Sequence, residues 1–242
     1  MALTIANHCV GCKAAARQLI EAIRELPIDG DWRLEIDDSG LTFETFLDGQ
    51  KTRFSPGFTD PRLRQRALQK NQGLIRACSN KRRSIRSVLD LTAGWGRDAF
   101  LLAAHGREVT MIEQNALIAH CLEFLLGLAR NADEHSPCHR TQLIRGDSLQ
   151  QLQQGATADC LYLDPMFPDH KSGAKPGKEL QILQQLTQNR SIEELFEQAL
   201  ASAAQRVVVK RPLHAPALSE RKPDLQYREK TIRFDVYLTA RG

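Results

Sequence analysis

A short loop after an apolar run carries the residues with the clearest chemical potential. Residues 161–168 read Leu-Tyr-Leu-Asp-Pro-Met-Phe-Pro. The exocyclic amine of a nucleobase is a poor nucleophile, because its lone pair is delocalised into the ring. The Asp164 carboxylate and a carbonyl near Pro165 can accept hydrogen bonds from both amine protons and so orient the lone pair. Proline stiffens the loop, and Phe167 can stack on a base taken out of its helix. We therefore predict Asp164, Pro165 and Phe167 as catalytic residues; the structural alternative is a proline-rich turn.

A glycine turn follows an earlier apolar run, in the stretch VLDLTAGWGRDAF. Gly94 and Gly96 allow the backbone to bend tightly and to approach a ligand closely. Their G-x-G-x-x-A spacing also satisfies a loose nicotinamide-dinucleotide fingerprint, which is a weak signal by itself. Arg97 and Asp98 come next, and a carboxylate at that point opposes a pyrophosphate. A cofactor that carries an amine and a sulfonium suits the same position.

Polar side chains also end the next two apolar runs. Glu113 ends VTMIE, where a carboxylate can accept hydrogen bonds from both hydroxyls of a ribose. Gln114 can contact the adenine edge, and Asp147 with Ser148 suits the adenine amine after LIRG. Each residue can instead be a loop cap. Three such groups at consecutive strand ends favour an adenosine cofactor, because open α/β sheets bind ligands at those ends.

Positive charge is concentrated in one segment of the chain. Residues 51–86 hold eleven Lys and Arg against one acid, a net charge of +10, whereas the whole chain carries only +4. Such density is typical of a phosphate-binding surface; a solvated helix face is the alternative, although such faces normally interleave acids. The residues that we predict to contact RNA phosphates are Arg82, Arg83, Lys171, Lys210 and Arg211.

The six cysteines are scattered, and several lie in apolar stretches. This distribution favours reduced, buried thiols over a disulfide framework. Cys9 and Cys12 form a C-x-x-C, but no second ligand pair for zinc follows and the βαβ context of a redox motif is missing. We therefore expect two small residues near the N-terminus, and no metal site.

Composition excludes several classes of protein. No run of about 18 apolar residues is present, so neither a transmembrane helix nor a membrane partner is expected. Residues 1–12 lack the basic start and long apolar core of a signal peptide, which favours a cytoplasmic protein. The oligomeric state stays open.

Hydrophobic periodicity predicts the elements that must position these side chains. Residues 13–26 have helical spacing, 32–36 and 41–46 alternate as a hairpin, and Asp60-Pro61 opens a basic helix to about residue 78. From residue 87 apolar runs alternate with helices, which predicts a doubly wound, mostly parallel α/β sheet. The predicted strands are 87–91, 109–112, 142–144, 160–163 and 207–209, then an antiparallel pair at 226–230 and 232–238; the predicted helices are 97–104, 116–130, 178–188 and 192–204. We divide the chain into an α+β domain, 1–86, whose basic segment 51–86 binds RNA, and a catalytic domain, 87–242.

The motifs LDLTAGWGRDAF, IEQN, YLDPMFP, RVVVKRP and RFDVY occur in this order. They closely resemble those of the bacterial small-subunit (16S) ribosomal RNA guanine-N2 methyltransferases, over about residues 87–240. The resemblance implies a Rossmann-like, seven-stranded class I methyltransferase sheet with an antiparallel C-terminal strand and a small N-terminal domain. It implies S-adenosyl-L-methionine as methyl donor and, as partner, 16S ribosomal RNA or the small ribosomal subunit, with 2-methylguanosine near the 3′ end as product. By motif, the cofactor contacts are Arg97, Asp98, Glu113, Gln114, Asp147, Ser148 and Asp164, to which the glycine turn adds Gly94.

Three other functions remain open at this point. The aspartate-proline-aromatic loop also permits methylation of another amine, such as adenine N6 in RNA or DNA. The glycine turn permits a nicotinamide-dependent oxidoreductase. The basic segment permits an RNA-binding module without catalysis.

Overall fold

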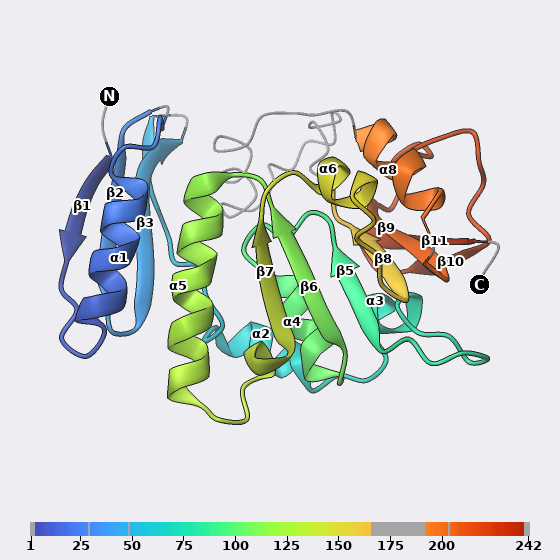
Figure 1. The fold of residues 1–242 in the computed structure, drawn as a ribbon, viewed down its shortest axis with the longest axis horizontal. Helices are drawn as coiled ribbons and strands as arrows, with labels where there is room; N and C mark the ends of the chain where they lie inside the picture. The colour runs from blue at the N-terminus through green and yellow to red at the C-terminus, as the bar shows by residue number, and fades with distance from the viewer. Residues whose placement is uncertain (1–2, 29, 48, 166–191, 203, 240–242) are drawn as a thin grey trace.

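The computed structural model describes residues 3–28, 30–47, 49–165, 192–202 and 204–239, and its described strands form two sheets (Figure 1). The larger sheet has seven described strands in the order β10-β11-β9-β8-β5-β6-β7. Strands β5 to β9 are parallel, while β11 pairs antiparallel with β9 and β10 pairs antiparallel with β11. This confirms the expected sheet and its antiparallel C-terminal pair. The bounds are β5 (Ser87–Asp90), β6 (Glu108–Glu113), β7 (Thr141–Arg145), β8 (Cys160–Leu163), β9 (Arg206–Pro212), β10 (Leu225–Arg228) and β11 (Ile232–Leu238).

Helices cover both faces of this sheet, as a doubly wound fold requires. Alternate strand residues point to opposite faces, so Val88 and Leu89 enter different apolar clusters. One cluster includes α4 (Arg97–Ala104) and α5 (Ala116–Ala132), and the other includes α8 (Ile192–Leu200), which contacts α6 (Ser148–Gln153). A short 3₁₀ helix, η1 (Pro137–Arg140), leads into β7. The helix expected at 178–188 lies outside the described residues.

The N-terminal sheet has the order β1-β2-β3-β4. Its strands are β1 (Leu3–Asn7), β2 (Trp32–Asp37), β3 (Gly40–Leu47) and β4 (Gln50–Phe54), with α1 (Lys13–Ile23) between β1 and β2. The predicted hairpin is confirmed as β2 and β3. Strands β1 and β4 were not predicted. Because β1 pairs parallel with β2, β1-α1-β2 is a βαβ unit, and the sequence-based statement that this context is missing around the C-x-x-C was wrong.

One apolar cluster runs through both sheets. Helix α5 lies between α1 and the large sheet, and it contacts α1 and β3 (Figure 1). The ring of Phe43 on β3 lies 5.4 Å from that of Trp95 in the glycine turn, and Phe54 on β4 lies 5.6 Å from Trp95. The N-terminal sheet therefore packs directly against the Trp95 side chain of the glycine turn. The domain boundary at residue 86 stays a prediction.

The basic segment folds differently from expectation. In place of one helix it forms α2 (Pro61–Ala67) and α3 (Gly73–Ala77), although Asp60 is the predicted N-cap and accepts a hydrogen bond from the Arg62 N–H at 2.9 Å. The break comes from Gln72, whose side-chain amide donates to two carbonyls of the preceding turn, and from Gly73. A Cβ on Gly73 would lie 2.7 Å from Glu229 Oε1 and 2.9 Å from the Phe234 ring. Glycine thus lets α3 dock on the C-terminal strands.

None of the described helices is both long and apolar enough to cross a membrane.

Candidate active site

Three elements meet at an ion-paired cluster beside Asp164. Asp164 follows β8, Lys210 lies on the neighbouring strand β9, and Asp98 lies in the first turn of α4. Lys210 Nζ lies 2.7 Å from Asp164 Oδ2 and 2.8 Å from Asp98 Oδ2. The Tyr162 hydroxyl donates to Asp98 Oδ2 at 2.6 Å. The ammonium group therefore bridges two carboxylates, and the phenol holds one of them in place.

Opposing effects set the protonation of this cluster. Burial alone would lower the pKa of Lys210, but the charges of Asp164 and Asp98 raise it above its usual value. Burial acts against ionisation of Asp98, yet Lys210 and the Tyr162 hydroxyl hold the pKa of Asp98 below its usual value. For Asp164, burial outweighs the attraction of Lys210, and the pKa lies above its usual value. Lys210 is therefore a permanent cation, and it favours the ionised form of Asp164.

The backbone of the Asp164 loop is fixed to the glycine turn. The Asp164 N–H donates to Thr92 Oγ1 at 2.6 Å, and the Thr92 N–H donates to Asp90 Oδ1 at 3.0 Å. Pro165 is buried. The predicted residues Phe167 and Lys171 lie outside the described residues. The ends of β5 and β8 are thus joined at the point where Asp164 leaves the sheet.

The glycine turn has the backbone that its sequence predicts. Gly94 and Gly96 have φ values of 52° and 71°, which favour glycine, and Gly96 is the N-cap of α4. A Cβ on Gly96 would lie 3.0 Å from Leu122 Cδ1. The turn therefore needs glycine both for its conformation and for its packing.

Glu113 links the second strand to that turn. Its carboxylate accepts hydrogen bonds from the Gly94 N–H at 2.8 Å and from the Asn115 N–H at 2.7 Å. Burial raises the pKa of Glu113 above its usual value, because these hydrogen bonds only partly offset the loss of water. Gln114 is exposed beside it. Glu113 thus lies at the carboxyl end of β6, next to the glycine turn, as the sequence predicts.

Other predicted contacts serve the local structure. Asp147 is the N-cap of α6 and accepts from the Gln150 N–H at 3.0 Å, and Ser148 Oγ donates to the Leu91 carbonyl at 2.6 Å. Arg97 is paired with Asp60 Oδ2 at 2.9 Å, so it ties α4 to α2. The hydrogen bonds of Asp147 and Ser148 are therefore those of loop caps, which was the structural alternative. Both residues nevertheless follow the carboxyl end of β7, at the same sheet edge as Asp164.

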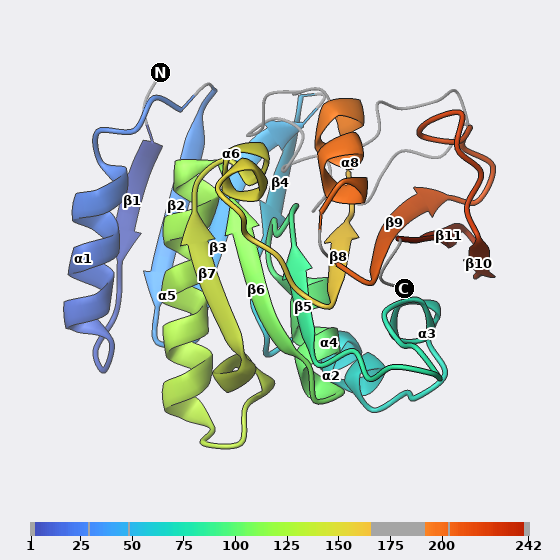
Figure 2. The same ribbon diagram turned by 45° about the vertical axis from the view of Figure 1, so that its right-hand side comes forward.

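The predicted phosphate contacts lie in different environments. Lys210 is held between two carboxylates, and Arg211 is 3% exposed and donates to the Pro216 carbonyl. The expectation that both are surface phosphate contacts is corrected by this placement. Arg82 and Arg83 are exposed, but they precede β5 at its amino end. Figure 2 shows α2 and α3 at that end of the central strands and α6 at the other.

Acidic groups outnumber cations where the strands end. Asp90, Asp98, Glu113 and Asp164 lie there, and Lys210 is paired with two of them. Burial, with smaller contributions from the other three acids, raises the pKa of Asp90 from 3.8 to about 8. At neutral pH Asp90 is therefore mostly uncharged, and the negative charge comes from Asp98, Asp164 and Glu113 against Lys210. A ligand with an ammonium and a sulfonium group would be attracted by this charge, whereas a pyrophosphate would be repelled. The residues therefore fit S-adenosylmethionine and disfavour a nicotinamide dinucleotide.

Comparison with known proteins agrees with this geometry. Residues 29–239 match the model of the family described as "Putative SAM-dependent methyltransferase". The chain belongs to this family. The cofactor of these SAM-dependent methyltransferases is S-adenosylmethionine, and the nicotinamide-dependent oxidoreductase is thereby set aside.

Individual methyltransferases align over most of the chain. A ribosomal RNA small subunit methyltransferase J from Thioalkalivibrio sulfidiphilus is 36% identical over 250 residues, which cover 96% of this chain and 98% of that one. Another, from Nitrosococcus oceani, is 39% identical over 212 residues, which cover 86% of this chain and 81% of the relative. The crystal structure of a SAM-dependent methyltransferase from Neisseria gonorrhoeae superposes with a TM-score of 0.72 at 28% identity. The superposition covers 100% of this chain and 97% of that one.

Because Asp90 is buried, we predict that the free energy of unfolding depends on pH. Its folded pKa of about 8 lies above the usual 3.8, so its contribution is fully present below the unfolded pKa and is lost as pH rises through about 8. Asp90→Asn keeps an oxygen for the Thr92 N–H but does not titrate. Relative to wild type, the variant gains up to about 1.4 kcal/mol of unfolding free energy per pH unit between about pH 5 and 8. Urea unfolding across that range measures the difference, and parallel profiles would contradict the assignment.

Proposed function

We propose that the protein transfers a methyl group from S-adenosylmethionine to the exocyclic N2 amine of one guanosine near the 3′ end of 16S ribosomal RNA. The observation that carries this proposal is the Asp164 carboxylate, held by Lys210 at the end of β8. The relatives named ribosomal RNA small subunit methyltransferase J support the choice of RNA. The motifs of the guanine-N2 family support the choice of amine.

The sheet topology supports this location for the chemistry. The chain leaves β5 toward β6 on one side, while β8 lies on the other side of β5. Ligands of open α/β sheets bind where the strand order reverses, outside the carboxyl ends of the strands. The glycine turn after β5 and Asp164 after β8 border that crevice. Cofactor and acceptor amine therefore meet there.

Asp164 has an oxygen available for the amine. Lys210 engages Oδ2, and among the described residues Oδ1 has no hydrogen-bond partner. An ionised Oδ1 accepts one amine hydrogen and leaves the nitrogen lone pair directed toward the methyl donor. Bound S-adenosylmethionine supplies the electrophilic methyl group. The carbonyl of Pro165 is the proposed acceptor for the second hydrogen, and Phe167 the proposed stacking partner.

We retain the predicted cofactor residues as part of this proposal, with roles adjusted to their contacts. Each oxygen of Glu113 accepts one backbone N–H and keeps a further lone pair for a ribose hydroxyl. Asp98 Oδ2 accepts hydrogen bonds from the Lys210 ammonium and from the Tyr162 hydroxyl. Its proposed role is therefore to position Lys210, which in turn holds Asp164. The remaining proposed contacts are Gly94, Arg97, Gln114, Asp147 and Ser148.

A methyl-acceptor assay tests the function. Small-subunit RNA from a strain that lacks the gene is expected to accept tritiated methyl groups from the pure protein, and RNA from the parent strain is not. Mass spectrometry of the digested RNA is expected to show 2-methylguanosine. A 6-methyladenosine product would favour the adenine alternative, and RNA that is fully methylated without the gene would refute the proposal.

Lys210 is expected to control the pH dependence of the rate. Lys210→Met leaves Asp164 with burial and the charge of Asp98, both of which raise its pKa. The ionised fraction of Asp164 then falls, by about tenfold for each unit by which its pKa exceeds the pH, so the rate is expected to drop toward low pH and to recover as pH rises. Asp164→Ala is expected to lose on the order of 10²-fold or more at every pH. Single-turnover rates against pH measure both, with the exposed Lys222→Met as control. A pH profile unchanged in Lys210→Met would contradict this role.

The exposed pair before β5 is expected to contribute to RNA affinity through phosphate charge. Reversing Arg82 and Arg83 to Glu weakens binding and reduces the slope of log affinity against log salt by about 2. Titrations at several salt concentrations measure the slope. The matched control reverses two exposed lysines at the other end of the chain, Lys222 and Lys230. If both pairs change the slope equally, the segment is only a solvated surface.

A further inference from the structure

Cys9 and Cys12 form a disulfide at the junction of β1 and α1. Cys12 is the N-cap of α1, and β1-α1-β2 is a βαβ unit. A C-x-x-C at such a junction is the arrangement of dithiol redox sites. For this pair, the disulfide corrects the expectation of reduced thiols. The other four cysteines are free and buried, so the bond selects this pair alone among the six.

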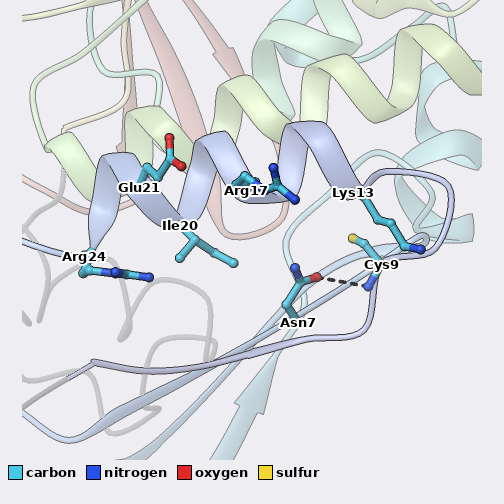
Figure 3. A pocket seen from close by; sticks show the side chains of 7 residues that line it. All are labelled: Asn7, Cys9, Lys13, Arg17, Ile20, Glu21 and Arg24. Carbon is cyan, nitrogen blue, oxygen red and sulfur yellow. Dashed lines mark hydrogen bonds between the residues drawn. The ribbon is translucent and has the colours of Figure 1, made fainter.

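A pocket of about 350 Å³ opens beside this disulfide, between α1 and the end of β1 (Figure 3). Such a volume is enough for a small ligand. Cys9 lines the pocket together with Asn7, Lys13, Arg17, Ile20, Glu21 and Arg24. Asn7 Oδ1 accepts a hydrogen bond from the Cys9 N–H at 3.0 Å, which fixes the backbone at the sulfur. The disulfide therefore borders a cavity lined mainly by charged side chains.

The charges define the chemistry that the pocket would accept. Lys13, Arg17 and the acid Glu21 lie on α1, and Arg24 is its C-cap, so the four charges sum to +2. Within the part of the chain that the structure describes, no ion pair engages the three cations. A small thiol with two carboxylates and one ammonium group complements this set, and glutathione is of that class. We propose that the pocket binds such a thiol and that the Cys9–Cys12 disulfide exchanges with it.

The exchange balances as two displacements. The thiolate of the bound molecule attacks Cys9 Sγ, a mixed disulfide forms, and the electron pair of the broken bond goes to Cys12 Sγ. A second thiolate of the same class attacks the small-molecule sulfur and releases Cys9 as a thiolate. Two thiols are oxidised to one small-molecule disulfide, and the protein disulfide is reduced by two electrons. The reverse sequence oxidises the protein pair.

The surroundings of Cys12, the first leaving group, partly favour its thiolate form. Cys12 lies at the N-terminus of an eleven-residue helix, whose positive end favours a thiolate. The Asp38 carboxylate opposes this effect, but Asp38 Oδ1 already accepts hydrogen bonds from the N–H groups of Val10, Gly11 and Cys12. Cys9 is only 7% exposed, but it is the cysteine that lines the pocket, so it is the expected site of attack by a bound thiol.

Thiol counting and exchange kinetics on the full-length protein test the proposal. Without reductant, the denatured protein is expected to show four reactive thiols, and six after reduction. Reduction by glutathione, uncharged mercaptoethanol and cationic cysteamine is then followed by alkylation and mass spectrometry. Arg17→Glu is expected to slow glutathione about tenfold while changing the mercaptoethanol rate less than about twofold. Lys230→Glu, the same charge change outside the pocket, is the control.

Trapping identifies the attacked sulfur. In Cys12→Ser, oxidised glutathione is expected to leave one glutathionyl group on Cys9. Six thiols in the unreduced protein would overturn the proposal, and so would equal effects of Arg17→Glu on all three reductants. These readouts are independent of methyl transfer, so their failure leaves the proposed methyltransferase activity unaffected.

Discussion

The ion pairs of Lys210 hold the proposed active site together. They join the ends of β8 and β9 to the start of α4, so one ammonium group connects two strands of the large sheet and a helix that covers it. Removing a buried charge from water is costly unless it is paired and hydrogen-bonded. Lys210 meets that condition with two carboxylates, one of which also accepts from Tyr162. Asp164 is thereby fixed in position and favoured as an acceptor, which a solvated carboxylate on a loop would not be.

A second set of contacts connects the Asp164 loop and the glycine turn to the rest of the molecule. Thr92 accepts from the Asp164 N–H, and Glu113 accepts from the Gly94 N–H, so both neighbours of β5 are fixed to the turn that follows it. Trp95 in the same turn packs on Phe43 and Phe54 of the N-terminal sheet. The N-terminal sheet therefore supports the glycine turn that borders the proposed cofactor site. Its contribution to function is then structural support of the turn, in addition to any contact with RNA.

Local patterns predicted the large sheet well, because each of its strands is a short apolar run bounded by turn residues. They failed where tertiary contacts decide. Gly73, where the basic segment breaks, donates its N–H to Glu229, which is 156 residues away in the chain, and β1 is a strand because β2 pairs with it. The role of Lys210 was missed for the same reason. A lysine after three valines at a strand end signals a functional group, but only the strand order places it beside Asp164.

The distribution of charge limits how RNA can approach. The carboxyl ends of the central strands hold the acidic cluster, whereas Arg82 and Arg83 lie at the amino end of β5. Phosphates would be repelled from the acids and attracted to the basic segment, so the backbone of the RNA is best accommodated away from the crevice. A base must then extend from that backbone to reach Asp164. Such a geometry favours a nucleotide in a loop or at an unpaired end, where a base can be turned out at low cost.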